Sequence, residues 1–139
     1  MPPNKRQEKQ TKSIEPEPAL DPITLEGLRE AIGDLTQIAQ TVLQELPARR
    51  ANLRLAFDAE NDAQVDKLAH LIAGSLSNLG ASKLTRLAYA MEIMDKNDNR
   101  DAARETLEQL ERESERVIAA LTMLLTTEHP GSHHTDPSQ

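Results

Sequence analysis

The sequence predicts an all-α protein, an antiparallel up-down four-helix bundle with a short additional N-terminal helix. Three observations predict this fold. Apolar residues recur with a period of about 3.6 in four long segments. The chain has one Phe, one Tyr and no Trp, whereas strands favour aromatic residues. The long segments are joined by short connections, which place consecutive helices side by side in opposite directions.

The first helix is expected to be short, capped by Asp21 or Thr24 and ended by Gly33. The second is expected over residues 34–59, where an apolar stripe continues on both sides of Pro47. Proline inside a helix either kinks or breaks it. Because the stripe resumes nearly in phase, we expect one kinked helix.

Three more helices complete the predicted bundle. The third begins near the capping residue Asp62 and ends at Gly80. The fourth is expected over residues 82–96 and the last over residues 101–125, separated by the turn-forming sequence NDN. None of these helices can bury its apolar stripe alone, so they are expected to pack on one another.

Both ends of the chain lack the apolar residues of a folded unit. Residues 1–22 carry five of the eight prolines and are interpreted as a flexible linker or tail. The bundle is expected over residues 23–126, followed by a disordered tail over 127–139. Histidines in this tail raise the question of metal binding, but a Pro- and Gly-rich segment offers no rigid scaffold, so a solvated tail without metal is favoured for His129, His133 and His134.

Composition narrows the classes of function. A formal net charge of −7 argues against a nucleic-acid binder. The absence of cysteine excludes disulfides and thiolate metal sites. No apolar run approaches the roughly 18 residues of a membrane span, and the N-terminus has no hydrophobic signal core. We expect a soluble, cytoplasmic and monomeric protein that makes no membrane contact.

One histidine lies on the wrong side of its helix for a core residue. At about 100° per residue, the apolar residues of the third helix cluster within roughly 50° of one direction. His70 falls about 140° from that direction, and Gly74 about 180°. Lys67 and Ser77 share this outer half. His70 is therefore expected to face solvent, where it is either an ordinary surface residue or a chemical site.

Gly74 is the residue one turn after His70 on the same face. Glycine inside a helix costs about 1 kcal/mol relative to alanine, so its presence needs a reason. A missing side chain would leave the imidazole open to an approaching backbone or phosphoryl group. The alternatives are close helix packing at Gly74 or a tolerated defect.

The order of these residues resembles the histidine-containing phosphotransfer (HPt) domain family. The residues that carry the resemblance lie in sequence order, with an acidic residue on the next helix: His70, Gly74, Ser75, Gly80, Ala81 and Glu92. The preceding helix with a proline near its middle and the short acidic turn AEND also match the family's order. The resemblance spans about residues 23–125, most of the chain.

The resemblance implies a phosphorelay module. In the family a histidine of a four-helix bundle accepts a phosphoryl group from a receiver-domain aspartate and passes it to a receiver. Carried over, His70 is the acceptor, and Gly74 provides clearance. The family needs no cofactor and no ATP site of its own, and the Mg²⁺ belongs to the receiver partner. Imidazole suits the role, because its free pKa of about 6.5 leaves it neutral and nucleophilic near pH 7.

The sequence departs from the family at one position. The family usually has a lysine three residues after the histidine, where this chain has Ala73. The positive charge could come instead from one of three nearby cations, or these cations could serve only solubility: Lys67, Lys83 and Arg86. Without the usual lysine, the stability of the phosphoryl group and the transfer rate are open.

Alternatives to a working relay module stay open. One is a bundle that binds a receiver or kinase and has lost the chemistry. A weaker one is a coiled-coil fragment formed by ETLEQLERESERVIAALTMLL, although about three heptads are short for that fold. A relay module itself could be free-standing or the C-terminal module of a hybrid sensor kinase.

Overall fold

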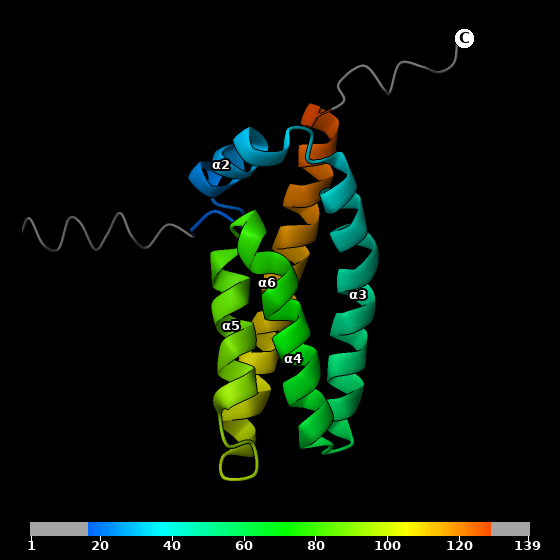
Figure 1. Cartoon of the computed structure of the whole chain (residues 1–139). Helices are drawn as coiled ribbons and strands as arrows, with labels where there is room; N and C mark the ends of the chain where they lie inside the picture. Colours follow the sequence, from blue (N-terminus) through cyan, green and yellow to red (C-terminus); the bar gives the residue numbers. More distant parts are fainter. Residues whose placement is uncertain (1–16, 129–139) are drawn as a thin grey trace, which may run out of the picture.

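The structure, a computed structural model, describes residues 17–128 of the chain. This part of the chain contains five α-helices and one 3₁₀ turn (Figure 1), and their bounds are α2 Pro22–Ile32, α3 Thr36–Asp58, α4 Asp62–Leu76, η1 Ser77–Leu79, α5 Ser82–Ile93 and α6 Arg100–Glu128. The prediction of an all-α bundle with a short N-terminal helix is confirmed.

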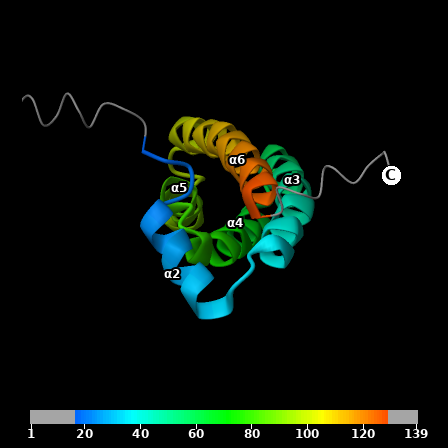
Figure 2. The same ribbon diagram turned by 90° about the horizontal axis from the view of Figure 1, so that it is seen from above.

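The four long helices form a closed ring when viewed along the bundle (Figure 2). Each packs on two others, in the order α3, α4, α5, α6 and back to α3. Helix α2 packs on η1 and lies across the end of the bundle where α4 turns into α5 (Figure 1). Consecutive long helices run in opposite directions because their connections are short.

The second predicted helix is continuous through Pro47, as expected. It begins at Thr36, slightly later than expected, because the Asp34 carboxylate accepts hydrogen bonds from the Thr36 backbone N–H and hydroxyl at 2.8 and 2.6 Å. The bond to the backbone N–H satisfies the first helical residue, whose N–H has no acceptor within the helix. The helix ends before Glu60, whose φ of 58° takes the chain out of the helical conformation.

The end of α4 differs from the prediction. The helix stops at Leu76, and η1 carries the chain to Gly80, so the expected helix over 62–80 is an α-helix followed by a tighter turn. Gly80 has φ 75°, and a Cβ there would lie 2.9 Å from the Thr24 Cβ and 3.0 Å from the Asp21 backbone N. Both the backbone conformation and the close approach therefore require glycine at this turn.

The last two helices also depart from their expected ends. Helix α5 stops at Ile93 rather than near residue 96, and α6 runs from Arg100 to Glu128 rather than from 101 to 125. The cause at α5 is Lys96, whose ammonium group turns back to bind the Met91 and Met94 carbonyl oxygens at 2.8 and 3.0 Å. A cation on the free carbonyls at the end of a helix stabilises that end.

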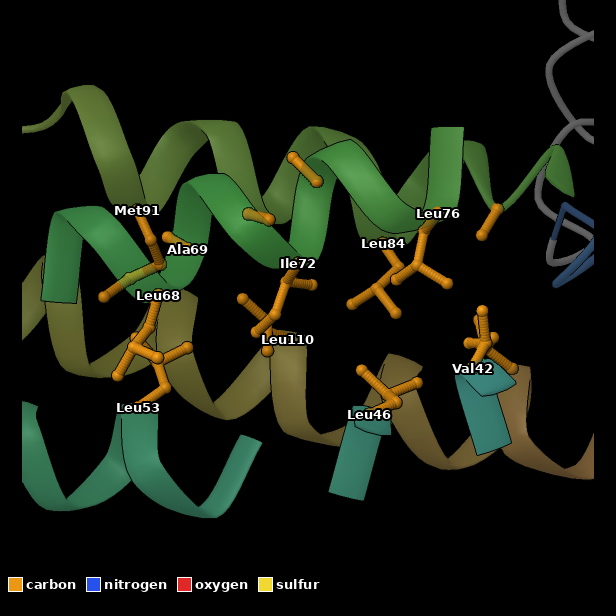
Figure 3. Packing of buried hydrophobic residues seen from close by; sticks show 14 of the residues in the cluster. Val42, Leu46, Leu53, Leu68, Ala69, Ile72, Leu76, Leu84, Met91 and Leu110 are labelled. Carbon is orange, nitrogen blue, oxygen red and sulfur yellow. The ribbon is translucent and has the colours of Figure 1, made fainter. Parts of the chain in front are cut away.

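The core is a single cluster of apolar side chains, all aliphatic except Phe57, and Figure 3 shows it along α4. Leu68, Ala69, Ile72 and Leu76 point from α4 into this cluster and meet side chains of α3, α5 and α6 (Figure 3). The apolar stripe predicted for this segment is confirmed, because all six of its residues are buried: Val65, Leu68, Ala69, Ile72, Leu76 and Leu79. Three polar side chains are also buried, and sequence analysis did not single them out: Lys96, Glu113 and Ser114.

The folded unit begins before residue 23, the boundary expected from the sequence. Ala19 and Leu20 are buried, the Asp21 N–H donates to the Gly80 carbonyl at 2.8 Å, and Arg116 donates to the Glu17 carbonyl at 2.7 Å. Residues 17–22 are thus packed on the bundle, contrary to the expected flexible tail. Residues 1–16 and 129–139, which include His129, His133 and His134, lie outside the described residues.

Candidate functional site

His70 lies in the middle of α4 and faces solvent. Helix α4 begins at the cap Asn61, whose side chain accepts from the Gln64 N–H at 3.3 Å, and its apolar residues then set which side packs inward. The His70 side chain is 65% exposed, as the helical wheel predicts. This exposure excludes His70 as a residue of the hydrophobic core.

Glu92 on α5 holds the His70 ring from one side. The His70 Nδ1 atom lies 3.2 Å from the Glu92 carboxylate, and the Glu92 side chain is 29% exposed. A carboxylate accepts hydrogen bonds only, so neutral His70 carries its proton on Nδ1. The lone pair of Nε2 is then available, and Nε2 has no hydrogen-bond partner within residues 17–128.

A shallow surface depression surrounds the exposed ring. It is lined by one apolar and four polar residues, which are Asp66, Lys67, His70, Leu71 and Glu92. Lys67 lies one turn before His70, makes no ion pair within the described part of the chain and is exposed. Its charge is therefore free to meet a negatively charged group on the ring.

The other predicted neighbours lie farther from His70. Helix α5 rises about 1.5 Å per residue, so Arg86 and Lys83 lie about 9 and 13 Å from Glu92 towards the α4–α5 turn. Ser77 lies a comparable distance from His70, about 10 Å along the axis of the helix. Arg86 also binds the Glu17 carboxylate, at 2.5 and 3.4 Å. None of these three residues lines the depression around His70.

Gly74 has open space where its side chain would lie. An added Cβ would have no neighbouring atom within 4 Å outside its own helix. Close packing within the molecule therefore does not explain this glycine, in contrast to Gly80. Gly27 in α2 is similarly unconstrained, so open space alone assigns no role.

Ala73 is fully buried, with 0% of its surface exposed. It occupies the position, three residues after His70, at which the family usually has a lysine. Helix α4 packs on both α3 and α5, and the position of Ala73 is covered completely. A lysine at this position would have to bring its stem out between two packed helices.

Sequence reasoning missed Asp66 and Lys96, which lie beside the predicted site. The Lys96 side chain is 3% exposed, and its Nζ lies 2.6 Å from the Asp66 Oδ1 atom. Asp66 could have been suspected because it lies one turn before His70. Lys96 follows the helix in a polar turn, and nothing in its sequence context predicts burial.

Other kinds of site were sought in the same part of the chain. No group of three or more His, Asp or Glu residues within 17–128 converges as metal ligands do. None of the helices described here is both long and apolar enough to cross a membrane.

The fold and the site together define a helical-bundle protein that presents one histidine, oriented by a carboxylate, to a second molecule. Residues 37–120, more than half of the chain, match the Hpt domain family, and the chain belongs to this family. It is therefore a histidine phosphotransfer module of phosphorelay signalling, and Hpt domains generally partner with receiver domains. No curated protein and no solved structure was found to match the chain.

Proposed function

We propose that His70 accepts a phosphoryl group from the phosphorylated aspartate of a receiver domain and passes it to a receiver. The observation that supports this proposal is the exposed imidazole whose Nδ1 is held by Glu92 and whose Nε2 has no partner in the described residues. The ring is thus oriented and accessible at one nitrogen.

The transfer follows from this arrangement. The Nε2 lone pair attacks phosphorus in line with the aspartyl P–O bond, the N–P bond forms, and the aspartate leaves as a carboxylate. The Nδ1 proton stays on the ring, so the product ring is positively charged and the Glu92 carboxylate stabilises it. The reverse reaction uses the same atoms, so the phosphoryl group can also return to a receiver.

Two neighbours of His70 support the same reaction. Lys67 would contact the phosphoryl oxygens. It would supply the positive charge of the usual family lysine, whose position is occupied here by Ala73. Gly74 would leave room for the receiver backbone at the ring edge. Ser77, Lys83 and Arg86 would lie at the rim of the docked surface, towards the α4–α5 turn. The receiver would supply the Mg²⁺, and the exchange would take place in the cytoplasm. The chain would act either as a free-standing protein or as a module of a hybrid sensor kinase.

A second candidate function is binding without transfer. Ala73 favours it, because the position of the usual family lysine holds a buried alanine. In that case the bundle would dock a receiver or a kinase through α4 and α5 and carry no phosphoryl group.

The variant His70→Gln separates the two candidates. The chain would be incubated with a panel of phosphorylated receiver domains, and an acid-labile, alkali-stable label on the chain would be measured. We expect label on the natural protein and none on the variant. Because the site is exposed and Gln is a good helix former, the free energy of unfolding should change by less than about 1 kcal/mol.

A matched control uses the other three histidines of the chain. A variant with His129, His133 and His134 all changed to Gln should keep the label. Label that persists on His70→Gln would contradict the acceptor assignment. Binding to a receiver without label on the natural protein would favour the second candidate.

A further inference from the structure

Lys96 makes a buried junction between α4 and α5. Its ammonium group donates to the Met91 and Met94 carbonyl oxygens at 2.8 and 3.0 Å and lies 2.6 Å from the Asp66 Oδ1 atom. An ammonium group has three donors; two of them make hydrogen bonds to these carbonyl groups, and the Asp66 carboxylate forms an ion pair with the charge. The Asp66 Oδ1 atom is itself buried, accepts no hydrogen bond in the described structure and has the Lys96 charge as its ion-pair partner.

The junction connects the two helical turns that carry the candidate site. Asp66 is four residues before His70 and therefore lies on the same face of α4, one turn away. Met91 directly precedes Glu92 in the last turn of α5 and Met94 is the C-cap of that helix, so their carbonyl groups lie at the helix end from which Glu92 reaches the ring. One buried cation thus holds both turns at a fixed separation.

We propose that Lys96 is a positioning residue that fixes the distance and orientation between His70 and Glu92. The proposal rests on the proposed function of His70, and it adds a residue that does not touch the phosphoryl group. Burial makes the junction rigid, since a lysine side chain in water would be free to change rotamer. A hydrogen bond of 3.2 Å between separate helices needs such a constraint to persist.

Lys96 also determines how Asp66 affects the site. Asp66 lines the depression around His70, and a bare carboxylate there would repel a phosphoryl group. The ammonium group offsets that charge from the interior side. Loss of Lys96 would therefore both loosen the ring and expose the phosphoryl group to repulsion.

The variant Lys96→Met tests the proposal, because Met retains the length of the stem and removes the charge. The first readout is the tautomer of His70, measured by ¹⁵N NMR at alkaline pH, where free imidazole is neutral. We expect the natural protein to hold the proton on Nδ1 and the variant to show a mixture of tautomers. The second readout is phosphoryl uptake, expected to fall on the order of tenfold to a hundredfold with receiver affinity changed less than twofold.

Arg54→Met serves as the control for a general loss of stability. Arg54 joins α3 to α6 through two hydrogen bonds to Glu111 at 2.9 and 2.8 Å, away from the α4–α5 pair. This variant should lose stability and keep both the His70 tautomer and the uptake rate. If Lys96→Met does not fold, the double variant Asp66→Asn, Lys96→Met leaves no buried unpaired charge and replaces it.

The outcomes are distinct. An unchanged tautomer and uptake rate in the folded Lys96 variant would overturn the positioning role. Equal changes in Lys96→Met and Arg54→Met would also overturn it, because they would show a general effect of destabilisation. If the natural protein takes up no label but Lys96→Met still changes the tautomer of His70, the proposed function is overturned and the positioning of His70 by Lys96 is supported.

Discussion

At the scale of single residues, the pairing of His70 with Glu92 decides which ring nitrogen can react. The carboxylate has one role before transfer, in which it selects the Nδ1–H tautomer. It has a second role after transfer, in which it faces a positively charged ring. Both roles come from one contact of 3.2 Å between neighbouring helices.

Glu92→Gln separates these two roles. The amide oxygen of Gln can still accept from Nδ1, but the negative charge is lost. A hydrogen bond to a charged group is stronger than a neutral one by roughly 1 kcal/mol, so uptake should slow several-fold. Single-turnover transfer from a phosphorylated receiver measures this rate. Glu105→Gln, at an exposed residue of α6, should leave it unchanged, and equal rates in all three proteins would contradict the role of Glu92.

Lys67 is the cation that the structure leaves beside His70. A point charge near a dianionic group at an exposed site is worth on the order of 1 kcal/mol. Lys67→Ala should therefore shorten the phosphohistidine lifetime or slow uptake several-fold, and added salt should reduce the difference. Arg112→Ala, another exposed cation, provides the comparison. If Lys67→Ala has no effect at low salt, Lys67 serves solubility alone.

At the scale of elements, α4 shows how one helix combines a buried and an open side. Ala73 and Gly74 are adjacent in sequence, yet Ala73 is fully buried and Gly74 faces open space. The difference arises because one residue along a helix turns the side chain by about 100°. A small residue at position 73 is therefore explained by burial, whereas packing within the molecule does not explain the small residue at position 74.

The same substituent at both positions tests these reasons. Gly74→Gln should keep or raise the free energy of unfolding by up to about 1 kcal/mol, because Gln favours the helix, while it slows transfer. Ala73→Gln should cost about 1–3 kcal/mol, because the side chain has no room at this buried position. Denaturant unfolding and the transfer assay measure the two effects. A transfer rate unchanged by Gly74→Gln would show that Gly74 is not a clearance residue.

At the scale of the whole molecule, hydrogen bonds hold the segment before α2 against α5 and α6. Glu17 receives hydrogen bonds from Arg86 on α5 through its carboxylate and from Arg116 on α6 through its carbonyl oxygen. The hydrogen bond from Arg86 holds the pKa of the Glu17 carboxyl below its usual value of 4.5, and the charges of Arg86, Lys83 and Arg116 act in the same direction. Leu20, three residues after Glu17, is buried and packs this segment on the core.

This lowered pKa predicts a pH-dependent contribution to stability. A carboxyl group whose pKa is lower in the folded state stabilises the fold above its unfolded pKa, here 4.5, and loses that effect as the pH falls through the folded value. Glu17→Gln should lower the free energy of unfolding by at most about 1 kcal/mol at pH 7, since the pair is partly exposed.

Thermal unfolding of the natural protein and of Glu17→Gln would be compared from pH 7 down to pH 3. The gap between the two melting temperatures should be constant above pH 5 and should close at lower pH. Glu108→Gln, at an exposed residue of α6, should show no such gap. A gap that is unchanged at the lowest pH would show that the carboxylate does not act through its charge.

The sequence by itself determined the helices and the outward direction of His70, because helical periodicity and capping are local properties of the chain. It also pointed to Gly80 as a turn, although the reason for the glycine includes contacts with Asp21 and Thr24, far away in sequence. Helix ends were less accurate, since the end of α5 depends on the folded-back side chain of Lys96.

Only the tertiary structure decided which contacts His70 makes. The family resemblance pointed to Glu92 and the helical wheel to Lys67, but only the packing of α4 on α5 sets the 3.2 Å contact of Glu92 with the ring. The other predicted neighbours, Ser77, Lys83 and Arg86, do not line the depression around His70. The packing of the helices also covers Ala73 and buries Lys96 against Asp66. Such contacts depend on the register between two helices, which local sequence patterns do not contain.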